Sequence, residues 1–277
     1  MVWSCLVSIL PGMAQTEKLT DYVNPFVGTD GYGNVYPGAQ IPFGGIQISP
    51  DTDSRFYDAA SGYKYNHLTL MGFSLTHLSG TGIPDLGDFL FIPGTGEMKL
   101  EPGTHEDPDQ GYRSRYSHDK EWASPNYYAV ELADYGVKAE MTSGVRSGMF
   151  RFTYPESDNA FIMIDMNHTL WQSCEWSNLR MINDSTITGY KLVKGWGPER
   201  HVYFTATFSK KLTGLRFVQD KKPVIYNTSR FRSSYEAWGK NLMACISFDT
   251  KAGEEVTVKT AISAVSTAGA LNNMKEL

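Results

Sequence analysis

Residues 202–208 read VYFTATF, with an apolar side chain at every second position. The same period of two recurs in residues 242–248 and 256–262. Successive side chains of an extended strand point to opposite faces, so this alternation predicts strands that bury one face. The β-branched and aromatic residues of these runs fit the pleated surface of a sheet. The three segments therefore favour an all-β protein.

The neighbouring segments extend the strand pattern. Residues 128–141 predict a β-hairpin about the turn signal Asp134-Tyr-Gly136, and residues 150–154 and 161–166 predict two more strands. Turn signals recur about every ten residues, which is typical of an antiparallel sandwich or barrel. The predicted fold is an antiparallel β-sandwich.

Two regions depart from this pattern. Residues 24–96 are rich in Gly, Pro, Asp, Ser and Thr and predict long ordered loops strung between short strands. Loops held on a rigid sheet are the usual place for binding residues. Ser266-Thr267 is a plausible cap for a helix over residues 268–277.

The composition excludes several classes of protein. The chain has 277 residues, of which 41% are hydrophobic and 20% charged, enough for a sizeable core and unlike a disordered or collagen-like chain. A net charge of −5 argues against a nucleic-acid partner bound through a basic face. No apolar run reaches the length of about 18 residues that a membrane-spanning helix needs, so no membrane partner is expected.

The first residues resemble a targeting signal. Residues 1–14 resemble the back half of a secretory signal peptide, with an apolar run that ends at Pro11-Gly12. This predicts a secreted or periplasmic protein; the alternative is a short frayed strand. Cys5 would leave with the signal. Cys174 and Cys245 would then form either one disulfide or two free buried thiols.

No short motif identifies a reaction. The six His show no HExxH spacing and no nearby Cys pair, so no metal ligands are assigned. The glycine-rich residues 28–33 and 80–82 lack the Lys-Ser/Thr of a phosphate loop and are better explained as tight turns. Ser79 has no nucleophile-elbow pattern around it. The sequence therefore assigns no catalytic residue.

The N-terminal loops have the composition of a carbohydrate-binding surface. Aromatic residues fall among Asp, Asn and His side chains, and sugar rings stack on aromatic faces while their hydroxyls need polar partners. The alternative is that these tyrosines cover the ends of the sheets. A glycosidase needs two carboxylates across its substrate, and no pair stands out here.

The same region carries several long motifs in a fixed order. They are Asp21-Tyr-Val-Asn-Pro-Phe-Val-Gly-Thr29, Tyr36-Pro-Gly-Ala-Gln-Ile-Pro-Phe-Gly44, Gln47-Ile-Ser-Pro-Asp-Thr52 and Gly72-Phe-Ser-Leu-Thr-His-Leu-Ser-Gly-Thr-Gly82. Shorter matches follow at Gly87-Asp88, Ser117-His-Asp119, Ala123-Ser-Pro-Asn-Tyr-Tyr128 and Val193-Lys-Gly195. Together they resemble the N-terminal part of glycoside hydrolase family 92, the calcium-dependent exo-α-mannosidases.

The resemblance implies a two-domain enzyme that acts on mannose-containing glycans. In that family an N-terminal β-sandwich, similar to galactose mutarotase, packs on a C-terminal helical domain. The helical domain supplies the catalytic acid, the base and most contacts to calcium. Hydrolysis inverts the anomeric centre, so acid and base stand far enough apart to admit a water. Calcium would hold sugar hydroxyls through its preference for oxygen ligands.

Domain boundaries follow from the same comparison. Residues 19–265 correspond to the sandwich domain, and residues 266–277 to the start of a linker helix toward a helical catalytic domain that this chain lacks. We therefore expect the chain alone to be inactive. The alternatives are a free-standing carbohydrate-binding sandwich and a mutarotase-like epimerase. The epimerase would need a His and Glu pair inside the sandwich, which the sequence does not single out.

The resemblance also nominates substrate-binding residues in the matched motifs. Asp51 would accept hydrogen bonds from hydroxyls, His77 would donate one, and the glycines would let backbone amides approach the sugar. Each has a structural alternative: Asp51 capping a turn, His77 bonded to backbone, and Phe26 in the core. The full set is Phe26, Gly28, Asp51, Thr52, His77, Ser79, Gly80, Thr81 and Gly82.

Overall fold

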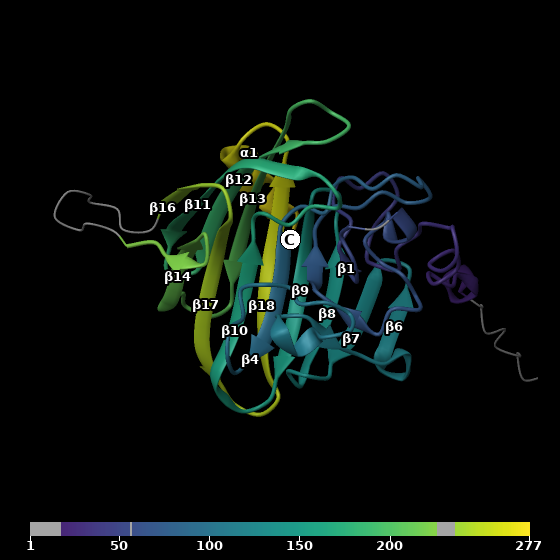
Figure 1. The fold of residues 1–277 in the computed structure, drawn as a ribbon, viewed down its shortest axis with the longest axis horizontal. Coiled ribbons are helices and arrows are strands. Elements are labelled where there is room, and N and C mark those ends of the chain that lie inside the picture. Colours follow the sequence, from purple (N-terminus) through teal and green to yellow (C-terminus); the bar gives the residue numbers. More distant parts are fainter. Residues whose placement is uncertain (1–17, 56, 226–235) are drawn as a thin grey trace, which may run out of the picture.

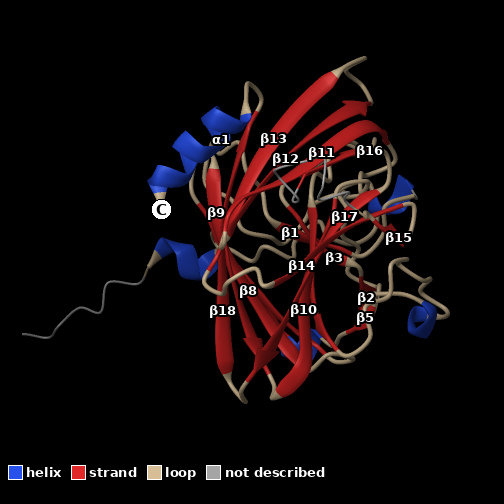
Figure 2. Cartoon of the chain, turned by 90° about the vertical axis from the view of Figure 1, so that its left-hand side faces the viewer, coloured by secondary structure: helices blue, strands red, loops and turns tan. Residues whose placement is uncertain are grey.

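Two antiparallel sheets face each other in the computed structural model, which describes residues 18–55, 57–225 and 236–277 (Figure 2). The seven-stranded sheet has the order β1 (Ser49–Asp51), β3 (Gly72–Ser74), β4 (Leu90–Thr95), β10 (Ser157–Asp165), β17 (Leu242–Thr250), β14 (Gly214–Gln219) and β15 (Lys222–Pro223). The nine-stranded sheet has the order β16 (Glu236–Gly239), β11 (Ser173–Asn183), β12 (Thr186–Lys194), β13 (Arg200–Phe208), β18 (Glu254–Ser263), β9 (Ser147–Tyr154), β8 (Val137–Ser143), β7 (Tyr127–Leu132) and β6 (Glu121–Ser124).

The remaining described elements are short. β2 (Thr69–Leu70) pairs with β5 (Ser114–Arg115). Single 3-10 turns occur at η1 (Leu19–Tyr22), η2 (Tyr57–Ala59), η3 (Pro108–Gln110), η4 (His118–Lys120) and η5 (Met274–Glu276). The N-terminal loops, purple and blue in Figure 1, lie at the end of the sandwich that holds β1 and β6. The predicted antiparallel β-sandwich with long N-terminal loops is confirmed.

The predicted elements are found where the sequence patterns place them. The three alternating runs form β13, β17 and β18, and the predicted hairpin is formed by β7 and β8 with Gly136 at a positive φ of 63°. The expected helix begins as α1 (Thr267–Asn273). The side-chain oxygen of Ser266 accepts a hydrogen bond from the backbone N–H of Gly269, which satisfies one free donor of the first turn.

The main core lies between the two sheets and is rich in phenylalanine. Phe89 and Phe91, on the side of the seven-stranded sheet, meet Phe204 of β13 and Phe150 of β9, and all four side chains are fully buried. The ring centroids of Phe89 and Phe204 are 4.4 Å apart, and those of Phe91 and Phe150 are 4.9 Å apart. These aromatic contacts join the two sheets.

The seven-stranded sheet is buried on its outer face as well. Along β10, Ala160, Ile162 and Ile164 point into the main core, while Phe161 and Met163 point outward into a second apolar cluster. Loop residues between β4 and β6, Tyr112 among them, cover this second cluster. The outer face of this sheet is therefore partly covered by loops, and a pocket can form between the loops and the sheet.

The cysteines and the N-terminal segment complete the comparison with the sequence. Cys174 in β11 and Cys245 in β17 are both buried and free, which confirms the thiol alternative over the disulfide. Residues 1–14, the predicted signal segment, lie outside the described residues. Within the described ranges, no helix is long and apolar enough to cross a membrane.

The phenylalanine contacts between the sheets make a stability prediction. We expect Phe204→Ala to lower the free energy of unfolding by about 3–5 kcal/mol, because it removes a fully buried ring and leaves a cavity between the sheets. Urea unfolding followed by circular dichroism measures this loss. Tyr203→Ala, on the half-buried outer face of the same strand, is the control and should cost clearly less. Equal losses would contradict the placement of the core.

Candidate functional site

The two glycine-rich segments meet in one layer of loops. The backbone N–H of Gly80 donates to the carbonyl oxygen of Asn34 at 2.6 Å, and Val35 N–H donates to Gly28 O at 3.2 Å. A Cβ on Gly33 would lie 2.2 Å from the Gly28 oxygen, so only glycine permits this approach. The glycines thus close tight turns, and the 77–83 loop packs directly on the 24–35 loop.

The nominated binding residues fall into two groups by exposure. Ser79, Gly80 and Gly82 are exposed at the tip of their loop, and Thr81 is half-buried there with its hydroxyl donating to Ile83 O. The second group, Phe26, Gly28, Asp51, Thr52 and His77, lies deeper in the protein. Phe26 is half-buried and packs both on the main core and on Tyr65, with ring centroids 5.8 Å apart.

Asp51 is the centre of a buried polar network. Its carboxylate oxygens each contact one imidazole: Oδ1 lies 2.8 Å from Nε2 of His77, and Oδ2 lies 2.9 Å from Nε2 of His168. The side chains of Asp51 and His77 have no exposed surface, and that of His168 is 4% exposed. A Cβ at Gly62, whose φ is +87°, would lie 2.1 Å from the Asp51 oxygen, so glycine is required there too.

The protonation states follow from the partners. Nδ1 of His77 lies 2.8 Å from the carbonyl oxygen of Gln47, which can only accept, so Nδ1 carries a proton. Burial by itself raises the pKa of the Asp51 carboxyl, but the charge and hydrogen bonds of His77 and His168 outweigh burial and hold it well below its ordinary value of 3.8. Asp51 is therefore a carboxylate at neutral pH.

This geometry changes how the nominated residues are understood. The Asp51 carboxylate binds two imidazoles instead of capping a turn, and His77 uses one nitrogen for the backbone and the other for Asp51. Thr52 is likewise buried, and its oxygen accepts from Lys64 N–H at 2.9 Å. All three lie behind the surface, where they position the loops. Their contact with a sugar stays a prediction.

A second buried ion cluster supports the same loops. The Asp88 carboxylate lies 3.1 Å from Nζ of Lys191 and 2.5 Å from a guanidinium nitrogen of Arg200, both on the nine-stranded sheet. Burial opposes the charge of Asp88, but Lys191 and Arg200 hold the pKa of the carboxyl well below its ordinary value. Lys191 also donates to the carbonyl oxygen of His168 at 2.6 Å. The cluster therefore fixes the His168 loop to the second sheet.

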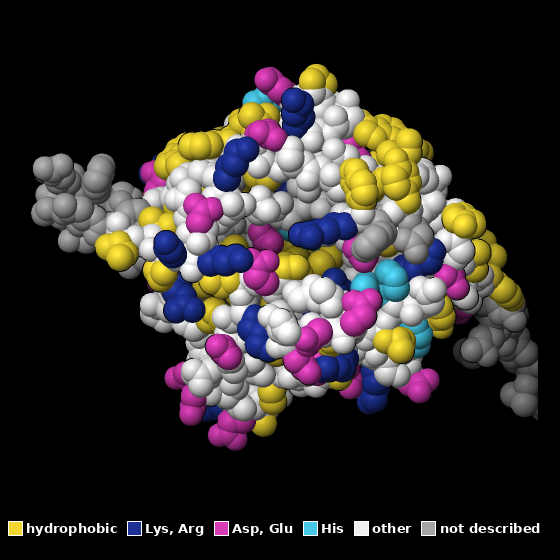
Figure 3. Space-filling view, viewed as in Figure 1, with side chains coloured by type: hydrophobic (Ala, Val, Ile, Leu, Met, Phe, Trp, Pro, Cys, Tyr) yellow, Lys and Arg dark blue, Asp and Glu magenta, His cyan; other side chains and the backbone are white. Residues whose placement is uncertain are grey.

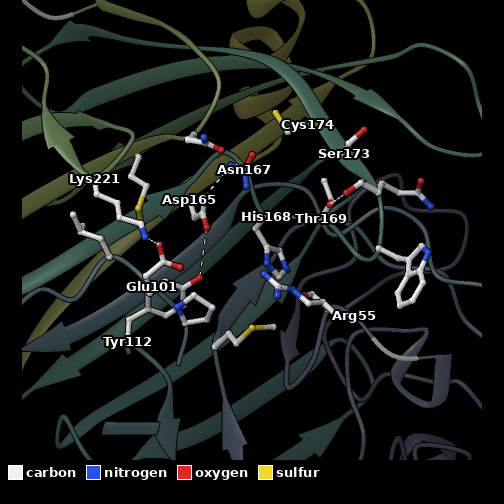
Figure 4. Close-up of a pocket in the computed structure, with 18 of the residues that line it drawn as sticks. Arg55, Glu101, Tyr112, Asp165, Asn167, His168, Thr169, Ser173, Cys174 and Lys221 are labelled. Carbon is white, nitrogen blue, oxygen red and sulfur yellow. Dashed lines mark hydrogen bonds and ion pairs between the residues drawn. The ribbon is translucent and has the colours of Figure 1, made fainter. Parts of the chain in front are cut away.

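A pocket of about 940 Å³ opens beside His168 on the outer face of the seven-stranded sheet. In Figure 3 this face is hollowed near its centre, with charged side chains around apolar ones. Asp165, Asn167 and His168 enter the pocket from the end of β10, and Arg55 extends toward His168 from the opposite loop (Figure 4). An ion pair of 2.5 Å between Lys221 and Glu101 borders the far side.

Asp165 is the last residue of β10 and lies on the same outward face of the strand as Phe161 and Met163. Its Oδ1 accepts from the backbone N–H of Asn167 at 2.8 Å, and the Tyr112 hydroxyl lies 3.5 Å from Oδ2. Burial raises the pKa of the Asp165 carboxyl above its ordinary value of 3.8. The pocket therefore holds a carboxyl group that gives up its proton less readily than a carboxyl in water.

Sequence reasoning did not single out His168, Asp165 or the pocket. His168 is 117 residues from Asp51, and only the pairing of the strands brings them together. One signal was present: Asp165 interrupts the otherwise apolar run of residues 160–166. A charged residue in such a run is a candidate for a functional group.

Calcium finds no complete ligand set in the residues described by the structure. Within the ranges 18–55, 57–225 and 236–277, no three His, Cys, Asp or Glu side chains cluster in a way that could hold a metal ion. The Asp51 carboxylate is already engaged by two imidazoles.

The sequence matches one protein family over most of its length. The family described as "Glycosyl hydrolase family 92 N-terminal domain" matches residues 22–263. The chain belongs to glycosyl hydrolase family 92. The family GH92 α-mannosidase BT3965 from Bacteroides thetaiotaomicron, also solved with mannoimidazole, is 99% identical to this family member with a TM-score of 0.92. The match covers 94% of this chain and 35% of BT3965 in the structure without ligand.

Two further relatives of this GH92 domain are less similar to it than BT3965 is. The GH92 inverting mannosidase BT2199 from the same bacterium has 24% identity and a TM-score of 0.76 over 94% of this chain and 34% of its own, which shows the fold. An uncharacterized secreted glycosidase from Arthroderma benhamiae is 30% identical over 50% of this chain and 17% of its own length. The chain thus spans about a third or less of these relatives.

The Asp51 network predicts a strong dependence of stability on one carboxylate. We expect Asp51→Ala to cost about 3–5 kcal/mol of unfolding free energy, since two buried imidazoles lose their partner. The lowered pKa means that this contribution is fully present above the ordinary value of 3.8 and is lost as pH falls below it. Urea unfolding at pH 7 and at lower pH measures both effects. The exposed Asp158→Ala is the control, and a similar loss there would contradict the assignment.

Asp165 predicts the opposite dependence on pH. With its pKa raised, the folded protein binds the proton more tightly than the unfolded chain, so stability falls as pH rises past 3.8. We expect Asp165→Asn to raise Tm by a few degrees at pH 7 and to change it little in acid, where the carboxyl is protonated in both states. Thermal scans across this pH range test the prediction. A lower Tm at pH 7 would show that the charged carboxylate stabilises the fold.

Proposed function

We propose that this chain is the N-terminal domain of an inverting exo-α-mannosidase that trims terminal α-mannosides from glycans. Membership of family 92 is the observation that carries the proposal. The near-identity to an α-mannosidase that was solved with mannoimidazole supports the substrate class. Mannose-containing glycans and a C-terminal helical domain are then the partners of this chain.

The loops of this domain form one wall of the mannose pocket. The exposed residues Ser79, Gly80 and Gly82 carry small side chains or none, so a sugar hydroxyl can approach their backbone closely, although the N–H of Gly80 itself is bonded to Asn34 O. The 24–35 loop supports this tip from below, and the Asp51 network anchors its base through His77. Such a rigid support keeps binding groups in place before the sugar arrives.

The bond-breaking groups belong to the helical domain. An inverting glycosidase needs an acid and a base about 6.5–9.5 Å apart with room for a water, and no pair in this chain is assigned to those roles. The calcium implied by the family would likewise take most of its ligands from outside this chain. We therefore propose that the isolated chain is inactive.

The place of action is proposed to be outside the cytoplasm, as a secreted or periplasmic enzyme. The secretory character of residues 1–14 and the secreted glycosidase from Arthroderma benhamiae support this location. Glycans with terminal mannose are extracellular substrates for such an enzyme.

The decisive experiment separates a domain of an enzyme from a free-standing module. The chain alone and the chain fused to the part of BT3965 that it does not cover would be incubated with α-linked mannobiose and 4-nitrophenyl α-mannoside. We expect only the fusion to release mannose, and NMR should show the β-anomer first, as inversion requires. Release by the chain alone would contradict the proposal, and an inactive, folded fusion would favour a carbohydrate-binding module.

A glycine substitution tests the role of the exposed loop. In the fusion, Gly80→Ala should lower kcat/KM at least tenfold, because the new methyl group occupies the surface that the sugar approaches. Gly253→Ala is a matched control: both glycines have positive φ, 73° and 75°, and no atom lies within 4 Å of the added Cβ. Both variants should lose about 1 kcal/mol of stability. Equal activity of the two variants would remove Gly80 from the substrate wall.

A further inference from the structure

Trp171 has an unusual backbone for a bulky residue. Its φ is 72°, in the left-handed region that favours glycine, and its side chain is 55% exposed. A residue of this kind in that region stores strain, and such strain persists only where the surrounding structure fixes the conformation. An exposed indole gains little from burial that would offset the strain. The strained backbone and exposed side chain of Trp171 therefore indicate a functional role.

The loop that carries Trp171 is held at three successive residues. Leu170 is fully buried and its N–H donates to Leu86 O at 3.0 Å, Trp171 N–H donates to Ser54 O at 2.8 Å, and the Gln172 amide donates to Pro84 O at 2.9 Å. The indole is therefore presented at one fixed place on the rim of the pocket. The Tyr57 ring extends this aromatic rim, with its centroid 5.7 Å from that of Trp171.

Behind the aromatic rim, the pocket offers polar groups of mixed character. The Asp165 carboxyl accepts hydrogen bonds, the Arg55 guanidinium donates them, and the Asn167 amide does both. All three line the same pocket, in which Arg55 extends toward His168 and Asp165 points toward the Tyr112 hydroxyl (Figure 4). The lining carries Glu101, Asp165 and Asp220 against Arg55 and Lys221, so its charge does not favour an anion such as phosphate, and the polar lining disfavours a wholly apolar ligand. A sugar has hydroxyls that both donate and accept, together with an apolar face for an indole.

We propose that this pocket is a carbohydrate-binding site in which a pyranose ring stacks on Trp171 and its hydroxyls bind Asp165, Asn167 and Arg55. The choice of mannose as the sugar rests on the proposed function; the site itself rests on the pocket and the fixed indole. The site holds a sugar residue of a glycan on the sandwich domain without any contribution from another domain. His168 lines this pocket and also contacts the Asp51 carboxylate, so it connects the pocket to the buried Asp51 network.

Calorimetric titration of the 277-residue chain with methyl α-mannoside and with α-linked mannotriose tests the site. We expect saturable binding with one site per chain, weakened at least tenfold by Trp171→Gly and partly restored in Trp171→Phe, which keeps an aromatic ring. Trp171→Gly should also raise Tm, since glycine relieves the positive φ. Loss of affinity with gain of stability separates a binding role from a structural one.

Trp122→Ala is the matched control. Its indole is 43% exposed on β6, at the far edge of the nine-stranded sheet, so affinity should stay unchanged. Equal binding by wild type and Trp171→Gly, or no binding of either mannoside or of matched glucosides and galactosides, overturns the site. Binding of another sugar with the same dependence on Trp171 keeps the site and counts against mannose. Mannose release by the fusion enzyme reports on the proposed function independently of these titrations.

Discussion

The Asp51 carboxylate, held between two buried imidazoles, is the interaction on which the functional end of the molecule depends. Asp51 belongs to β1, His77 to the loop after β3, and His168 to the loop after β10. One side chain thus joins three segments that are far apart in the sequence. Because a buried charge without partners is very costly, each of the three segments stabilises the position of the other two. The loop layer and the pocket are therefore connected through the same buried polar network.

The ion cluster at Asp88 extends this unit to the other sheet. Lys191 is fully buried, contacts Asp88, and donates to the backbone of the His168 loop. Two kinds of contact therefore join the two sheets. Phenylalanine rings pack between them in the centre, and ion pairs join them at the end that carries the loops. The rings contribute apolar burial, while the paired charges restrict how the loops are oriented on the second sheet.

Much of the fold could be predicted from the sequence because its strands keep a regular period. β13, β17 and β18 alternate without interruption and were visible from residue types alone. The sequence pattern predicts no strand over β11, and its pairing with β12 shifts register between Cys174 and Trp176 and again between Met181 and Asn183. An irregularity of this kind breaks the period of two, so the sequence signal is lost.

The site was less accessible to prediction than the fold. The matched motifs led to Asp51 and His77, but a motif does not say whether a side chain is buried, and both proved to lie beneath the surface. The partner His168 and the pocket residue Asp165 depend on strand pairing over long distances in the sequence. The left-handed backbone of Trp171 has no signature in residue type, because tryptophan is among the residues least expected to adopt it.

The position of β10 in the middle of the seven-stranded sheet has a consequence for the newly made chain. Its segment 160–164 is apolar on both faces, and it pairs with β4 on one side and β17 on the other. β4 has left the ribosome before β10 is made, but β17 begins only at Leu242. At about 5–20 residues per second, the open edge of β10 waits several seconds for its second partner. Over that interval one edge of an apolar strand is open to wrong pairing, which makes the incomplete chain prone to aggregation.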